Sequence, residues 1–141
     1  MDSSLHTITT ELGLDPRIFH NPAHFIASVR EGVSGQVLRR ALRQLGSELI
    51  FAQALHTDSA GLESYCTDTP LDRRRSEVLL DTIRILDRVR RTWESNELAQ
   101  QWLHSNVPAL GGVKPVEMFD TYEGRRWVTQ VAEKVEHGDF S

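Results

Sequence analysis

The chain has 141 residues, a net charge of −4, 39% hydrophobic residues and 26% charged residues, which suits one folded domain or two very small ones. This composition excludes a disordered chain and a general nucleic-acid binder, and no run approaches the ~20 apolar residues that a membrane helix needs. Met1–Thr10 lacks a basic region and an apolar region, and Cys66 is the only cysteine, so we expect neither a secretory signal nor an intrachain disulfide. A cytoplasmic protein is therefore expected.

The first part of the chain, residues 1–31, is predicted to be an N-terminal extension with one short helix. Its first twenty residues show no sustained periodicity, so we expect them to be only partly ordered. Asn21 and Pro22 are typical of a cap and a first helical position, and Gly32 is typical of the end of that helix.

Residues 32–69 are predicted to form a helix-turn-helix region. Ser34 and Ser47 are expected to cap helices over 36–45 and 48–56, and a polar turn then leads to a brief helix over 60–66. The exposed positions of this second, DNA-reading helix are predicted to be Ser59, Glu63, Ser64 and Tyr65. It has no Arg or Lys, which argues against base reading by this helix.

The longest helix is predicted over about residues 71–93, with Thr69 and Pro70 as its start. Its apolar residues form a stripe wide enough to contact neighbours on two sides, so a second copy of the chain could cover the surplus and form a homodimer. The run Arg73, Arg74 and Arg75 has two interpretations, which are a solvated helix start and a set of phosphate contacts.

The last forty residues are rich in turn signals. Ser95 is expected to cap a helix over 96–103 with Leu98 facing inward, and a turn follows at Pro108–Gly112. Lys114 and Pro115 restart the chain, Thr121 caps a final helix, and Gly138 ends it in a left-handed conformation. In that final helix the periodicity places apolar residues on one side (Trp127, Val128, Val131, Val135) and polar residues largely on the other (Arg125, Arg126, Gln130, Lys134). The fold class is therefore all-α, with about seven helices.

These forty residues resemble the toxin-binding domain of the Xre/MbcA/ParS antitoxin family. The resemblance is carried, in order and at similar spacing, by Trp102-Leu103, Pro108-Ala109-Leu110-Gly111-Gly112, Pro115, Thr121, Glu123-Gly124, Val128, Glu136-His137-Gly138 and Phe140. It extends more loosely back to about Gly32, which makes residues 32–69 similar to an Xre-like region and residues 70–141 a long helix with a C-terminal toxin-binding domain.

The resemblance implies an antitoxin of a type II toxin–antitoxin system whose partner is a RES-domain toxin that consumes NAD⁺. The antitoxin would occlude the active site of the toxin, in a higher toxin–antitoxin complex, and would itself need neither catalytic residues nor a cofactor. The implied toxin-binding residues are Leu110, Gly111, Gly112, Lys114, Pro115, Thr121, Glu123, Glu136, His137, Gly138, Asp139, Phe140 and Ser141. Autorepression at operator DNA would use Ser59, Ser64, Tyr65, Arg73, Arg74 and Arg75.

Other functions stay open at this point. The chain could be a DNA-binding transcriptional regulator, or an orphan adaptor without a RES toxin. An enzyme is the class least supported, because no nucleophile, acid–base pair or metal set converges. His20 and His24 have the spacing of a helical zinc pair, but Pro22 lies between them, so we expect two surface histidines and no metal. Cys66 is expected to be a semi-buried, unreactive thiol.

Overall fold

The computed structural model describes residues 4–136 and 138, and it confirms an all-α fold. The described residues contain no β-strand, and their β-type backbone pairing is limited to two isolated bridges, Ser34–Pro70 and Val107–Val113. The helices are α1 (Ser4–Leu12), α2 (Pro22–Glu31), α3 (Gly35–Leu45), α4 (Glu48–Ala54), α5 (Ser59–Tyr65), α6 (Arg73–Trp93), α7 (Asn96–Leu103) and α8 (Tyr122–Glu136), with the 3₁₀ helices η1 (Pro108–Leu110) and η2 (Pro115–Met118).

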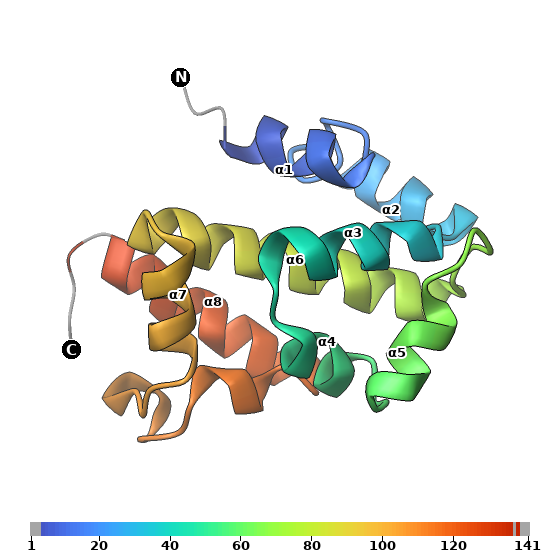
Figure 1. Cartoon of the computed structure of the whole chain (residues 1–141). Coiled ribbons are helices and arrows are strands. Elements are labelled where there is room, and N and C mark those ends of the chain that lie inside the picture. The colour runs from blue at the N-terminus through green and yellow to red at the C-terminus, as the bar shows by residue number, and fades with distance from the viewer. Residues whose placement is uncertain (1–3, 137, 139–141) are drawn as a thin grey trace.

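The long helix α6 is the axis of the molecule, and the other helices pack around it (Figure 1). It contacts α1, α2, α3 and α4 from the first half of the chain and α7 and α8 from the second half. Its buried positions, from Ser76 to Val89, therefore cover nearly its whole circumference. The prediction that a second copy could cover a surplus apolar face of this helix is wrong, because one chain already covers that face.

The start of α6 differs from the sequence prediction. The carboxylate of Asp72 accepts a hydrogen bond from the backbone N–H of Arg75 at 2.7 Å, so Asp72, and not Thr69, is the cap. Pro70 lies outside the helix, where it forms the bridge with Ser34, and the N–H of Leu71 donates to the carbonyl of Val33 at 2.7 Å. The connection before α6 is thus tied to the start of α3.

The first twenty residues are more regular than predicted, because they contain α1. Ile8, Leu12 and Ile18 are almost fully buried in the common core. The guanidinium of Arg40 donates to the carbonyl of Leu12 at 3.1 Å, which ties the last turn of α1 to α3. The description of residues 1–31 as an extension with one helix is therefore wrong.

Helices α4 and α5 occupy the predicted helix-turn-helix position, and they pack against each other. Their boundaries shift from the prediction. Asp58 caps α5 by accepting from the N–H of Gly61 at 2.9 Å, whereas Ser47 makes no side-chain cap at the start of α4. Whether this pair reads DNA stays a prediction. No helix in the described ranges is both long and apolar enough to cross a membrane.

Candidate functional site

The loop between α7 and α8 is built on a tight turn that the Pro108–Gly112 sequence predicts. Gly111 and Gly112 have φ values of +70° and +80°, in the left-handed region that glycine adopts without strain. The N–H of Val107 donates to the carbonyl of Val113 at 3.2 Å and closes the turn. The two glycines are exposed, while their N–H groups donate to the carbonyls of Pro108 and Val107 and the carbonyl of Gly112 accepts from Asn106.

The start of α8 explains why Thr121 and Gly124 stand three residues apart. The hydroxyl of Thr121 accepts a hydrogen bond from the N–H of Gly124 at 2.9 Å, which is the predicted cap. A β-carbon at Gly124 would lie 2.1 Å from the carbonyl oxygen of Met118, closer than any real contact. Only glycine therefore lets α8 approach η2 at this point.

Arg125 is the main surprise in α8, because the periodicity placed it on the polar side and the structure buries it. Its side chain is only 8% exposed, and its Nε donates to Asp81 of α6 at 2.8 Å. Its Nη1 donates to the carbonyl of Phe119 at 2.9 Å. Trp127 differs in the opposite sense, since it was placed on the apolar side and is 40% exposed. The ion pair between Arg125 and Asp81 joins α8 to α6.

The last turn of α8 is also tied to α6. Arg88 Nη2 lies 3.3 Å from the carboxylate of Glu136 and 4.0 Å from that of Glu133, and the hydroxyl of Thr92 donates to Glu136 at 3.4 Å. Gly138 has a φ of +78°, which confirms the predicted left-handed residue after the helix. Arg88 and Thr92 of α6 thus fix the last turn of α8.

A small apolar groove of about 210 Å³ lies beside this end of α8. Its lining contains the tilted ring pair of Trp93 and Trp102, whose centroids are 6.2 Å apart. Val131 and Val135 of α8 also line the groove, and Lys134 stands among them. The groove therefore lies beside the last turns of α8.

The structure divides the predicted toxin-binding residues into three groups. Leu110 and Pro115 are buried, so they shape the loop from below, and their place among the toxin-binding residues stays a prediction. Exposed residues of the predicted set are Gly111, Gly112, Lys114, Thr121, Glu123, Glu136 and Gly138. The remaining four, His137, Asp139, Phe140 and Ser141, lie outside the described residues.

The predicted DNA-contacting residues lie at the other end of α6. Ser59 and Ser64 are exposed on α5, with their hydroxyls bonded to Glu48 and to the carbonyl of Gly61. The guanidinium of Arg75 lies 4.8 Å from the Tyr65 ring centre and pairs with Asp72. Arg73 and Arg74 are exposed and make no ion pair within the described part of the chain, so they are available for phosphates.

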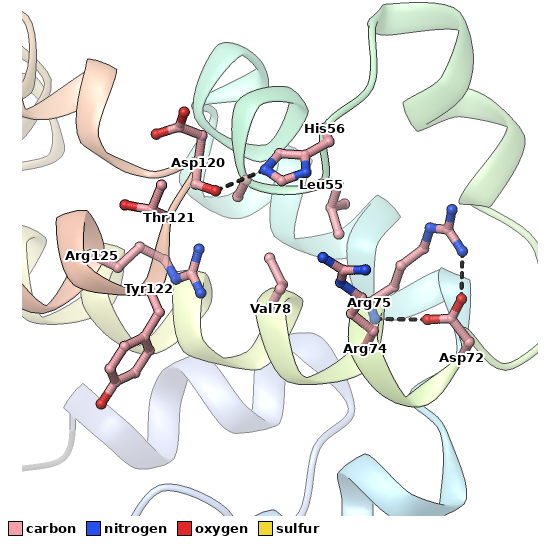
Figure 2. A pocket seen from close by; sticks show the side chains of 11 residues that line it. Leu55, His56, Asp72, Arg74, Arg75, Val78, Asp120, Thr121, Tyr122 and Arg125 are labelled. Carbon is pink, nitrogen blue, oxygen red and sulfur yellow. Dashed lines mark hydrogen bonds and ion pairs between the residues drawn. The ribbon is translucent and has the colours of Figure 1, made fainter.

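A larger cleft, of about 560 Å³, lies between the end of α4, the start of α6 and the start of α8 (Figure 2). Its lining includes the predicted Arg74, Arg75 and Thr121, together with His56 and Tyr122, which the sequence did not single out. The three parts of the chain are far apart in sequence, and no motif joins them. Sequence reasoning could not have found this cleft.

The remaining residues singled out in the sequence have local structural roles. His24 lies 3.7 Å from the carboxylate of Asp15, and no three His, Cys, Asp or Glu side chains among the described residues gather as a metal site would require. Burial raises the pKa of the Cys66 thiol, whose sulfur lies 3.3 Å from the carbonyl of Leu62. A raised pKa lowers the thiolate fraction at neutral pH and makes a nucleophilic role unfavourable.

Two comparisons with known proteins bear on the C-terminal half. Residues 88–138 match the family described as antitoxin Xre/MbcA/ParS C-terminal toxin-binding domain. A curated protein of Sphingobium sp. (strain YBL2), named Prs ADP-ribosylating antitoxin, is 26% identical over 132 residues, which cover 86% of this chain and 83% of that protein. The family match contains the turn, the groove and all of α8.

Proposed function

Because residues 88–138 match the toxin-binding domain of the Xre/MbcA/ParS antitoxin family, we propose that this chain neutralises a RES-domain toxin that consumes NAD⁺. The antitoxin role follows from the family, whereas the toxin class and the type II mechanism are our proposal. The curated relative has ADP-ribosylation in its name, and transfer of ADP-ribose uses NAD⁺ as the donor. That chemistry supports an NAD⁺-consuming partner in the cytoplasm.

Occlusion of the toxin's active site is the mechanism that the surface supports best. The observation that carries it is the set of exposed features within the matched region, which are the Gly111-Gly112 turn, the outer face of α8 and Gly138. Phe140 would fill an apolar part of the toxin pocket, since aromatic residues in desolvated pockets dominate many interfaces. Asp139 would face the basic residues that hold the phosphates of NAD⁺.

Deletion of residues 137–141 tests this mechanism. The deletion leaves Glu136 and its ion pair with Arg88 in place, so circular dichroism and the unfolding midpoint should change little. Co-expression with the toxin should then arrest growth, whereas the full chain should rescue it. Phe140→Ala alone should weaken the complex by about 2 kcal/mol if this residue is an anchor.

A chain in which residues 139–141 are replaced by Gly-Ser-Gly is the matched control, because it keeps the length of the tail and removes its chemistry. It should behave like the deletion. If the shortened chain stays helical and still rescues growth, the tail does not block the toxin. The contact would then lie on the turn at 111–114 or on the outer face of α8.

Autorepression by DNA binding is a second proposed function, favoured by Arg73 and Arg74. Both are exposed and unpaired within the described residues, and they stand beside α5 at the start of α6. The binding should depend on phosphates more than on bases, because α5 presents no basic side chain. The chain would act on its operator as a homodimer and within a larger complex with the toxin.

A gel-shift assay at two salt concentrations tests the DNA proposal. We expect affinity to fall steeply with salt and to differ little between operator and unrelated duplexes. The double variant Arg73→Gln, Arg74→Gln should reduce the affinity and the salt slope together. Tight, salt-insensitive binding to one palindrome would contradict phosphate-dominated contact. An orphan adaptor would show neither DNA binding nor rescue from a RES-domain toxin.

A further inference from the structure

The cleft in Figure 2 presents cationic side chains around an apolar floor. The guanidinium groups of Arg74 and Arg125 are turned toward Val78 from opposite sides, and the ring of His56 stands above them (Figure 2). The two guanidinium groups come from α6 and α8, and His56, whose Nε2 is bonded to the carbonyl of Asp120, follows α4. Such a convergence of positive groups on one small space is suited to an oxyanion.

Arg125 contributes a donor that its structural contacts leave unused. Asp81 and the carbonyl of Phe119 bind its Nε and Nη1, and within the described residues Nη2 makes no hydrogen bond. The side chain is more than nine-tenths buried, so this N–H₂ group is held in a fixed position at the cleft wall. A fixed donor needs no ordering when a ligand binds, which favours affinity.

The carboxylates of the cleft do not cancel this charge. Asp72 is engaged with Arg75 and with the start of α6, and Arg75 turns away from Val78 toward it (Figure 2). The carboxylate of Asp120 also points away from Val78, while its carbonyl oxygen is bonded to Nε2 of His56 at 2.8 Å (Figure 2). Neither carboxylate of the cleft therefore faces Val78, where the guanidinium groups of Arg74 and Arg125 converge (Figure 2).

We propose that this cleft binds the phosphate group of a small soluble ligand, such as a phosphomonoester or a nucleotide. The volume of about 560 Å³ is within the range of small-molecule sites. Ala54, Leu55 and Val78 would contact the apolar part of the ligand, and Arg74, Arg125 and His56 would contact the phosphate. The site needs no toxin, so this proposal does not rest on the proposed function.

The DNA proposed above would lie across the outside of the start of α6, and the neighbouring arginines distinguish it from a small phosphate inside the cleft. Arg73 is as exposed as its neighbour Arg74, yet only Arg74 lines the cleft. A duplex backbone lying across the start of α6 would contact both residues. A small phosphate inside the cleft would contact Arg74 alone.

Calorimetric titration of the full chain with inorganic phosphate and with AMP, at constant ionic strength in chloride, tests the proposal. We expect both to bind. Arg74→Gln should weaken the binding by about tenfold or more, as loss of a charge-assisted hydrogen bond predicts. Arg73→Gln, which removes the same charge one residue away, should change it less than about twofold.

His56→Asn is the second variant, because asparagine tolerates the positive φ of +54° at this position. It should also weaken phosphate and AMP, and circular dichroism should confirm that both variants keep the fold. Equal losses in Arg73→Gln and Arg74→Gln would indicate diffuse attraction and overturn the proposal. Absence of phosphate and AMP binding in the unaltered chain would also overturn it, as would binding of a short DNA duplex alone.

Discussion

At the scale of single residues, the Arg125–Asp81 pair is the interaction on which the C-terminal helix most depends. Both side chains are almost fully buried, and removal of one partner of such a pair leaves an uncompensated charge that costs about 3–5 kcal/mol. Asp81 keeps a second partner, Arg84, at 2.7 Å. We therefore expect Arg125→Met to reduce the free energy of unfolding by about 3 kcal/mol, the lower end of that range, measured by urea denaturation.

The next residue along the chain supplies the control for this prediction. Arg126 is exposed and pairs with Glu123 on the same helix at 3.2 Å, an arrangement that contributes little in water. Arg126→Met should change the free energy of unfolding by less than about 0.5 kcal/mol. Equal effects of the two substitutions would show that Arg125 is not the residue that joins α8 to α6.

At the scale of elements, α1 belongs to the core and is not an appendage. Leu12 is fully buried, whereas Thr10 on the same helix is exposed. Leu12→Ala should lower the free energy of unfolding by about 3 kcal/mol, the cost of removing a buried leucine and leaving a cavity. Thr10→Ala should have almost no effect in the same denaturation experiment. If Leu12→Ala were also silent, α1 would not be packed in solution.

Local patterns in the sequence predicted most helices, because caps and turns are short-range features. Ser95, Thr121 and Gly138 stand where the sequence placed them, at helix ends. The start of α6 was misplaced because Pro70 is an equally good first helical residue and only the pairing with Ser34 takes it out of the helix. Helix α1 was missed because its described buried apolar residues, Ile8 and Leu12, are a single pair four positions apart, which is too few to show a helical period in the sequence.

The candidate site was less predictable than the fold, because its contacts join residues far apart in sequence. Arg125 is polar, and nothing near it in the sequence indicates the buried Asp81, which lies 44 positions away. Gly124 was recognised from the family pattern, but its physical reason is the carbonyl of Met118 in the folded chain. The cleft around Val78 needs three separate segments and therefore exists only in the tertiary structure.

At the scale of the whole molecule, the two proposed binding regions lie at opposite ends of α6. The arginines stand at its start, beside α5, and the last turn of α8 lies near its other end (Figure 1). A helix of 21 residues is about 30 Å long. A toxin bound at the terminus would therefore leave the arginines accessible, and one antitoxin could hold toxin and DNA together.

Self-association is a property of the whole molecule. Because α6 is covered within one chain, we expect contact between two copies to use exposed apolar residues on other helices. Leu49 of α4 and Leu98 of α7 are 54% and 48% exposed, and the prediction that Leu98 faces inward is wrong. Gln100 of α7 donates to Ser47, the residue before α4, at 2.8 Å. Burial of such side chains against a second copy would be favourable.

Light scattering at micromolar concentration should therefore give twice the 16.0 kDa of one chain. Leu98→Lys should return the mass to that of the monomer, because a charge would have to be buried at the contact. Ile26→Lys, which places the same charge on an exposed position of α2, should leave the dimer intact. A monomeric unaltered chain would rule out a stable dimer, and dissociation by Ile26→Lys alone would place the contact on α2.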